Sequence, residues 1–272
     1  MSEITAFKSQ TAIVTGGSRG LGRGIVAALA SRQMRVVALS NDADRLASTA
    51  KELGVESVVA DVADPITSGR LLQDLKPDLV VLCAGALPLM RPLQFHTWET
   101  FSLNWNVDAR ATFNWVRDAL LLPMKPGSHV IVISSIASIF GSPLSGSYAG
   151  AKGMQRLLTE YAAEESARIK LNLRFHCLLP TLNPNTDLGR ATMVAYAQRA
   201  GLSVEKFAKR FDPPLTPAIM GQAIVDLHEN PTKWDELAYR VSGGGLTPVA
   251  QANQGKPVLG GDPTASKTSA AD

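Results

Sequence analysis

The stretch TAIVTGGSRGLG, residues 11–22, decides the fold. Its first five residues, TAIVT, are mostly apolar and rich in β-branched side chains, as a buried strand requires. Glycines at positions 16, 17, 20 and 22 lead into the helix-like run GRGIVAALASR, residues 22–32. Glycine lets the backbone approach a ligand closely, and the free amides at a helix N-terminus favour phosphate. The stretch is typical either of a phosphate-binding turn or of a glycine-rich connection alone.

Strands and helices alternate along the rest of the chain. Apolar runs predict further strands at 35–40, 56–62, 78–85, 129–135, 173–180 and 239–245, mostly separated by helical patterns. Nearly continuous apolar strands are typical of a parallel sheet covered on both faces. We therefore predict an α/β fold: a doubly wound, mostly parallel sheet of the Rossmann type with helices on both faces. Its strand ends should share one crevice, lined by Thr15, Ser40, Asp61, Gly85 and Ser135.

The chain is expected to form a single domain over residues 1–250. Residues 181–217 are rich in Pro, Asn and Thr and include a helical piece at 193–200, which predicts a lid over the crevice. Residues 251–272 are polar and rich in Gly, Pro and Ser, which favours a flexible C-terminal tail over a folded subunit arm.

Composition narrows the function classes. The net charge of +3 and the lack of a basic run with interleaved aromatic residues argue against nucleic-acid binding. Cys83 and Cys177 lie in apolar runs and are interpreted as buried thiols, and the four histidines show no metal-ligand spacing, so no metal site is predicted. A polar start and the absence of a bilayer-length apolar run predict no membrane association. The expected location is the cytoplasm.

A second stretch, SIASIFGSPLSGSYAGAK at residues 135–152, carries candidate chemistry. Tyr148 and Lys152 are four residues apart, so they share a helical face if Ser145 or Ser147 caps a helix there. A nearby ammonium favours the phenolate, which would suit the tyrosine to general acid–base catalysis. Ser135, at the end of a predicted strand, could donate a hydrogen bond to a substrate oxygen. Taken alone, the tyrosine–lysine pair is weak evidence, because such a pair far more often lies on a solvated helix surface.

The joint order of these motifs resembles the short-chain dehydrogenase/reductase family, in its single-domain branch, over residues 8–246. The positions that match are Thr15, Gly16, Gly20 and Gly22 of a TGxxxGxG turn, Asp61, Ala84-Gly85, Asn106-Val107, Ser135, and Tyr148 with Lys152 as YxxxK. Asn106 lies within a long helix predicted over 97–122. Any one of these motifs is weak, whereas their combined spacing is specific.

The resemblance implies a mechanism in which four residues are catalytic. Tyr148 would exchange a proton with the substrate oxygen, and Ser135 would polarise that oxygen. Lys152 would bind the nicotinamide ribose and lower the pKa of Tyr148, and Asn106 would hold a relay water. The implied cofactor-binding residues are Gly16, Ser18, Arg19, Gly20, Leu21, Gly22, Ser40, Asn41, Asp61, Val62, Ala84, Gly85, Tyr148, Lys152, Pro180 and Thr181.

The chain departs from the family pattern at two turns. Leu82-Cys83 precede Ala84-Gly85 where the family commonly has two asparagines, and Thr181 follows Pro180 where a glycine is usual. In addition, Thr186 lies one residue later than the family's threonine. These departures bear on the backbone around the nicotinamide.

The residues near the expected ribose favour NADP, with NAD as the alternative. The second strand ends in neutral Ser40, where an acidic residue would hold the 2′-hydroxyl of NAD. Arg19 matches a basic residue of NADP-preferring members and suits a phosphate. Asn41 replaces a second arginine and Asp42 follows it, so the pattern is mixed.

We therefore predict an NADP(H)-dependent oxidoreductase acting on a small or medium-sized ketone or secondary alcohol. One alternative is a 3-oxoacyl thioester reductase, and another is a noncatalytic nucleotide-sensing protein on the same fold. Members of this branch are often tetramers, so a homo-oligomer, tetramer or dimer, is expected, and small-molecule substrates are the only other partners.

Overall fold

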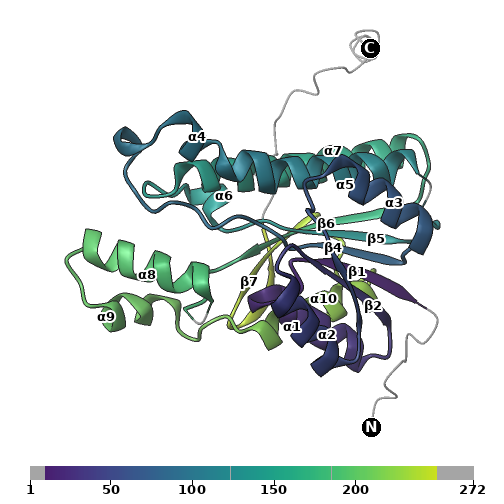
Figure 1. The fold of residues 1–272 in the computed structure, drawn as a ribbon, viewed down its shortest axis with the longest axis horizontal. Coiled ribbons are helices and arrows are strands. Elements are labelled where there is room, and N and C mark those ends of the chain that lie inside the picture. The colour runs from purple at the N-terminus through teal and green to yellow at the C-terminus, as the bar shows by residue number, and fades with distance from the viewer. Residues whose placement is uncertain (1–9, 123, 185, 250–272) are drawn as a thin grey trace, which may run out of the picture.

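The structure is a computed structural model that describes residues 10–122, 124–184 and 186–249 (Figure 1). The predicted tail at 251–272 lies outside the described residues. An eight-stranded sheet runs through the centre in the order β3-β2-β1-β4-β5-β6-β7-β8. Its strands are β1 (Thr11–Thr15), β2 (Arg35–Ser40), β3 (Glu56–Val59), β4 (Leu79–Leu82), β5 (His129–Ile133), β6 (Arg174–Pro180), β7 (Ala238–Ser242) and β8 (Gly245–Pro248).

The first seven strands are parallel, and only β8 pairs antiparallel, with β7. The predicted doubly wound fold is confirmed. The sequence analysis missed β8 because Gly243 and Gly244 form a tight two-residue turn: Ser242 pairs with Gly245 across it. The predicted strands at 56–62 and 78–85 are shorter in the structure, because their last residues turn into loops at the carboxyl edge of the sheet.

Helices cover both faces of the sheet (Figure 1). On one face lie α1 (Gly20–Ser31), α2 (Ala43–Leu53) and α10 (Pro217–Glu229), and on the other α3 (Pro65–Leu75), α5 (Arg110–Leu121) and α7 (Gly146–Arg168). Successive strand residues point to opposite faces, so Val14 packs with α1 and α10 while Ile13 packs with α3 and α5. This double burial explains why the central strands β1 and β4 are almost continuously apolar.

The helix ends follow local sequence signals. Asp42, Asp64 and Thr216 cap α2, α3 and α10 by accepting a backbone N–H bond at 3.1, 2.9 and 3.2 Å. Gly54 ends α2 in the left-handed conformation, with φ at 64°. These caps fix where each helix leaves the sheet edge.

The region 97–122 is not the single helix that its sequence predicts. It divides into α4 (Trp98–Phe101), a π-helical turn η2 (Trp105–Ala109) and α5. The π turn lies beside α7, and such turns often occur at functional sites. The remaining short elements are η1 (Leu93–Phe95), α6 (Ala137–Phe140), α8 (Asp187–Arg199), α9 (Val204–Ala208) and η3 (Lys209–Phe211). Helices α8 and α9 project from one end of the sheet, within the predicted lid (Figure 1).

Three histidines meet in the core at the amino ends of β5 and β6. His129 Nε2 lies 2.6 Å from His176 Nδ1, and the His228 ring of α10 stacks on His129 with 5.8 Å between centroids. Burial lowers the pKa of His176 and of His228 to about 4, and it lowers that of His129 too. Across residues 10–122, 124–184 and 186–249, no cluster of three or more His, Cys, Asp or Glu could hold a metal. Within the same residues, no helix has the length and apolarity to cross a bilayer.

Candidate active site

A cavity of about 900 Å³ opens at the carboxyl edge of the sheet. It is lined by the loops that follow β1, β2, β3, β4 and β5, by the end of β6 and by α8. The predicted catalytic and cofactor-binding residues, except Asn106, line this cavity: Gly16, Ser18, Arg19, Gly20, Leu21, Gly22, Ser40, Asn41, Asp61, Val62, Ala84, Gly85, Ser135, Tyr148, Lys152, Pro180 and Thr181. Thr15, which the sequence also predicts to line the crevice, does not. The topology thus brings residues 165 positions apart into one crevice.

The glycine turn after β1 leaves no space for side chains. Gly16 has a φ of 69°, and a Cβ there would lie 2.8 Å from the Ala84 Cα atom. A Cβ on Gly22 would lie 2.1 Å from the Gly16 carbonyl oxygen. The side chain of Arg19, the residue before α1, does not cap this helix, so its first amides remain available to an anion. The cradle fits the diphosphate of a dinucleotide.

Thr15 fixes the turn in which the family's asparagines are absent. Its hydroxyl oxygen accepts the N–H groups of Cys83 and Ala84 at 3.0 and 3.1 Å. It also lies 3.4 Å from the Val81 carbonyl oxygen. The Thr15 side chain at the end of β1 therefore stabilises the turn at 82–85, although neither residue 82 nor residue 83 is an asparagine.

Ser135, Tyr148 and Lys152 converge beneath the cavity. The Ser135 hydroxyl forms a hydrogen bond with the phenol of Tyr148. The Lys152 Nζ atom lies 5.4 Å from the Tyr148 ring centroid and donates to the Ile133 carbonyl oxygen at 3.2 Å. Tyr148 and Lys152 share one face of α7, as their spacing predicts.

The predicted caps of α7 are wrong in detail. The helix begins at Gly146, after Ser145, but Ser145 makes no side-chain cap. Its hydroxyl instead lies 2.6 Å from that of Ser142, and Ser147 donates to the Phe101 carbonyl oxygen. These serines join α7 to the neighbouring loops.

Asn106 is not brought to this site. Its exposed side chain lies outside the cavity, with Nδ2 3.4 Å from the Ser102 hydroxyl. Asp108 takes the inner position, since it is fully buried and its Oδ2 atom lies 3.3 Å from Lys152 Nζ. Its Oδ1 atom accepts the Ala86 N–H at 2.8 Å.

The spacing of buried residues along the helix explains why Asp108, and not Asn106, faces Lys152. The same spacing could have predicted Asp108 from the sequence. Buried Ala111, Thr112 and Trp115 lie three, four and seven residues after Asp108, on one helical face. Asn106 is two residues away from Asp108 and points elsewhere. The family motif pointed to Asn106-Val107, whereas the spacing of the buried residues in the same helix points to Asp108.

Burial dominates the electrostatics of Tyr148. It raises the pKa of Tyr148 above its ordinary value, and the lowering by the Lys152 charge and the Ser135 hydrogen bond does not overcome it. Asp108 and Cys83 shift the same pKa upward. Burial would lower the pKa of Lys152, but Asp108 and Tyr148 together hold it above its ordinary value. Lys152 is therefore charged, yet it does not lower the pKa of the Tyr148 phenol toward neutral pH, contrary to the prediction from the sequence.

Charged groups gather at the end of the cavity formed by α2, the glycine turn and α8. Arg19 and Arg190 pair with Asp187, at the start of α8, and Arg45 Nη1 lies 3.6 Å from the same carboxylate. Asp42 caps α2 and lies 3.3 Å from Arg45. Sequence analysis missed Arg45 and Asp187, because their proximity depends on how α8 folds back over the turn.

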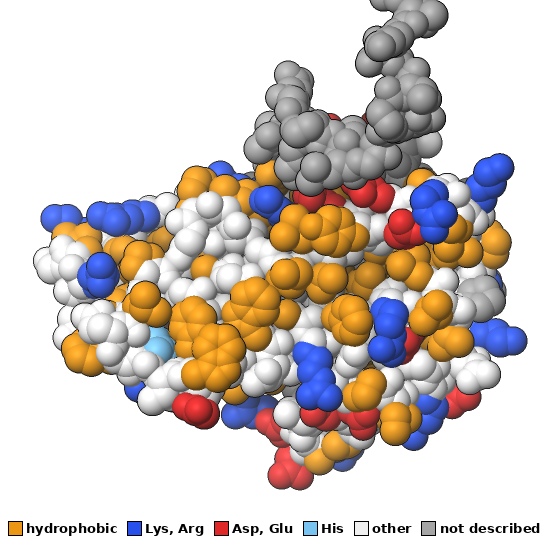
Figure 2. Space-filling view, turned by 90° about the horizontal axis from the view of Figure 1, so that it is seen from above, with side chains coloured by type: hydrophobic (Ala, Val, Ile, Leu, Met, Phe, Trp, Pro, Cys, Tyr) orange, Lys and Arg blue, Asp and Glu red, His pale blue; other side chains and the backbone are white. Residues whose placement is uncertain are grey.

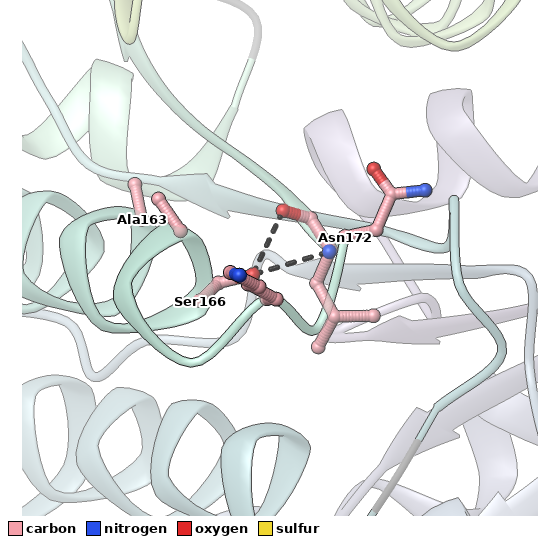
Figure 3. Close-up of a pocket in the computed structure, with 6 residues that line it drawn as sticks. Ala163, Ser166 and Asn172 are labelled. Carbon is pink, nitrogen blue, oxygen red and sulfur yellow. Dashed lines mark hydrogen bonds between the residues drawn. The ribbon is translucent and has the colours of Figure 1, made fainter.

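A second hollow of about 330 Å³ lies at the far end of α7 and has a structural explanation (Figure 3). Ser166 accepts the Leu173 N–H at 3.1 Å and donates to the Leu173 carbonyl oxygen at 3.2 Å. These bonds close the connection from α7 to β6. The serine is satisfied within the turn, so the larger cavity is the candidate site.

Comparison with known proteins now identifies the family. The sequence model of the short chain dehydrogenases matches residues 10–193. The chain belongs to the short-chain dehydrogenase/reductase family. It is thus an NAD(P)-dependent oxidoreductase of the ketone and alcohol type, and the predicted family and enzyme class are confirmed.

Several characterised members are similar over most of their length. The carbonyl reductase [NADPH] 2 of Sus scrofa is 31% identical over 192 residues, which are 68% of this chain and 76% of the relative. The L-xylulose reductase of Bos taurus is 32% identical over 184 residues, 66% and 74% of the two chains. The D-erythrulose reductase of Gallus gallus is 27% identical over 197 residues, 70% and 77% of the two chains.

Proposed function

We propose that this enzyme is an NADP(H)-dependent carbonyl reductase that acts on a small or medium-sized uncharged ketone, or on the corresponding secondary alcohol in reverse. The observation that carries the proposal is the convergence of Ser135, Tyr148 and Lys152 beneath the cavity that also holds the glycine turn. A tyrosine and a lysine that merely shared a solvated helix surface would not be buried at the floor of such a cavity. This favours the enzymatic interpretation over a nucleotide sensor.

In this proposal the cofactor supplies the hydride, and the chain supplies binding and proton transfer. The turn at Gly16 and Gly22 holds the diphosphate, because only hydrogen fits at those Cα atoms. Ser135 donates a hydrogen bond that orients the carbonyl oxygen, and Tyr148 gives that oxygen its proton. Lys152 holds the ribose side of the cofactor and stabilises the phenolate that remains.

The cavity lining supports an uncharged substrate. Most lining side chains from 133–145 and 180–192 are apolar or carry a hydroxyl, such as Ile136, Ser142, Leu182 and Thr192. Among the described lining residues of those two segments, Asp187 alone is charged, and it is paired with Arg19. The relatives are named as reductases of carbonyls, L-xylulose and D-erythrulose, and these names agree with a neutral ketone as the substrate. Arg19 and Arg45, at the end of the cavity formed by α2, the glycine turn and α8, could attract the acidic carrier of a 3-oxoacyl thioester, which keeps that reaction as the second candidate.

The preference for NADP rests on Arg19, Arg45 and the neutral end of β2. Ser40 lies at that end with its hydroxyl 3.0 Å from that of Ser18, and Asp42 is occupied as a helix cap. Neither places a free carboxylate where the 2′-hydroxyl of NAD would bind. Two guanidinium groups in the cavity lining suit a 2′-phosphate.

Fluorescence titration with NADPH and with NADH tests this preference. We expect NADPH to bind more tightly, and Arg19→Ala to weaken NADPH binding by roughly 10- to 100-fold while NADH binding is unchanged. Arg23→Ala is the matched control, since Arg23 lies four residues later, in α1, but pairs with Glu52 outside the cavity. Equal affinity for both nucleotides would refute the phosphate site. Failure of both to bind would refute a dinucleotide site in this cavity.

We also propose that residues 181–217 act as a lid and that the protein is a homo-oligomer. Helix α8 lines the cavity through Leu188, Gly189 and Thr192, which supports the lid. Apolar side chains spread over the face of the molecule seen in Figure 2. Phe113 of α5 and Tyr161 of α7 are 48% and 54% exposed, which suits packing against a second copy. Light scattering of the purified protein gives the oligomeric state, and a monomer would refute the second proposal.

The compartment remains a prediction. Cys83 and Cys177 are free thiols, Cys177 being fully buried, which supports a reducing compartment such as the cytoplasm.

A further inference from the structure

The geometry points to Asp108 as a positioning residue that adapts this site to reduction: its carboxylate offsets the charge of Lys152 and so adds to the burial that favours the protonated phenol of Tyr148. The catalytic consequence rests on the proposed function. The electrostatic arrangement itself does not, because it is built from the chain's own residues.

Asp108 is placed to act on Lys152. It has no exposed surface, and its Oδ2 atom lies 3.3 Å from Lys152 Nζ, which is itself only 5% exposed. In so dry a location neither charge is screened by water, so each strongly influences its neighbours. The two together form a neutral pair beneath the tyrosine.

The carboxylate is held rigidly. Its Oδ1 atom accepts the Ala86 N–H at 2.8 Å, and a Cβ on Gly85 would lie 3.0 Å from its Oδ2 atom. Gln155 of α7 donates to the Asp108 carbonyl oxygen at 3.2 Å. The Asp108 backbone is therefore tied to α7 and its carboxylate to the turn after β4, so turning the carboxylate away from Lys152 would break the bond to Ala86.

The groups that act on Tyr148 come from four elements. Lys152 lies on its own helix, Asp108 on η2, Cys83 on the turn after β4 and Ser135 on the loop after β5. Lys152 and the Ser135 hydrogen bond favour the phenolate, while burial, Asp108 and Cys83 favour the phenol. Among the described residues, Asp108 is thus the acidic group that counters the lysine at this tyrosine.

Protonation of Tyr148 decides the direction that the site serves. In reduction, the carbonyl carbon accepts the hydride while the phenol O–H bond breaks and its proton forms the new alcohol O–H bond. The phenolate then regains a proton from solvent. In oxidation, the phenolate must be present first to take the alcohol proton. A group that favours the phenol over the phenolate therefore serves reduction and slows oxidation.

The test is an ultraviolet titration of tyrosinate in the protein without cofactor. The signal of Tyr148 is isolated by subtracting the same titration of the matching variant that also carries Tyr148→Phe. Asp108→Asn removes the charge but keeps the shape and the acceptor for the Ala86 N–H, so it separates the electrostatic role from the structural one. Thermal unfolding confirms that each variant is folded, and Asp108→Ser serves as a second neutral variant if the asparagine one is not.

We expect Asp108→Asn to lower the pH at which Tyr148 ionises by about one unit or more. Lys152→Met in that background should raise it again, which shows that the lysine of the single variant is still charged. An unchanged or higher midpoint in both neutral variants of Asp108 would overturn the proposal. So would identical midpoints with and without Lys152 in the asparagine background.

Alkylation of Cys83 gives a second measurement, because the Lys152 charge acts on this thiol. Cys83 is partly exposed, whereas Cys177 is fully buried. Burial raises the pKa of Cys83 to about 11, and the Lys152 charge opposes that rise. Alkylation by iodoacetamide at neutral pH should be several-fold faster in Asp108→Asn than in the wild type, and an equal rate would count against the proposal. Neither measurement requires turnover. A protein that reduces no ketone would therefore refute the proposed function, while the effect of Asp108 on Tyr148 could still be tested.

Discussion

The buried histidine cluster makes the stability of this protein dependent on pH. His176 and His228 are 6% and 8% exposed, and burial lowers the pKa of each from 6.5 to about 4. The unfolded chain therefore binds protons at these histidines at a higher pH than the native protein does. The native state keeps its full stability above about pH 6.5 and loses stability as the pH falls from there toward 4.

The size of the loss follows from the two pKa values. At pH 5, each histidine is almost fully protonated in the unfolded chain and almost fully neutral in the native protein, which costs about 2 kcal/mol per residue. Both together remove about 4 kcal/mol from the free energy of unfolding between pH 7.5 and pH 5. A loss of that size is a large share of the 5–15 kcal/mol typical of a domain.

Urea unfolding at pH 7.5 and at pH 5 measures this effect, followed by circular dichroism. His228→Gln should reduce the difference between the two pH values by about 2 kcal/mol, because it removes one of the titrating groups. His96→Gln is the matched control, since His96 lies outside the cluster, beside Phe101. A free energy of unfolding that is the same at both pH values, or an equal pH dependence in His228→Gln and the wild type, would refute this reasoning.

Two further predictions concern the nucleotide end of the cavity. Gly22→Ala places a Cβ 2.1 Å from the Gly16 carbonyl oxygen, so NADPH affinity should fall at least tenfold in fluorescence titration, whereas Gly153→Ala, with no atom within 4 Å, should bind as the wild type does. Wild-type affinity in Gly22→Ala would show that the turn does not cradle the nucleotide. Asp187→Asn removes the carboxylate that competes with a phosphate for Arg19 and lies 3.6 Å from Arg45. It should strengthen NADPH binding several-fold and leave NADH binding unchanged, and weaker NADPH binding would mean that Asp187 organises the arginines instead.

The fold could be predicted from local sequence signals because several independent signals in the chain indicate the same elements. The central strands β1 and β4 are apolar on both faces, Asp42 and Asp64 lie at helix starts, and Gly54 marks a helix end in the left-handed conformation. The strand ends then had to share one edge, which placed Ser40, Asp61 and Ser135 correctly beside one cavity. These features depend on sequence neighbours and on the handedness of parallel crossovers.

What could not be predicted depends on contacts between distant segments. Asp108 reaches Lys152 only because the π turn and α7 pack together. The Arg19–Asp187 pair joins residues 168 positions apart, and the histidine cluster joins two strands and α10. The upward shift in the pKa of Tyr148 has the same origin, since burial depends on the packed structure and not on the tyrosine–lysine spacing.

The central claim is that Tyr148 is the proton donor of an NADPH-dependent ketone reduction. The most direct measurement is oxidation of NADPH with a panel of neutral ketones, including hydroxylated ones, for the wild type, Tyr148→Phe and Tyr161→Phe. Tyr161 lies on the same helix but is exposed and outside the cavity, so it is the matched control. We predict that Tyr148→Phe lowers kcat at least 100-fold while still binding NADPH, and that Tyr161→Phe turns over as the wild type does. Undiminished turnover in Tyr148→Phe would contradict the account.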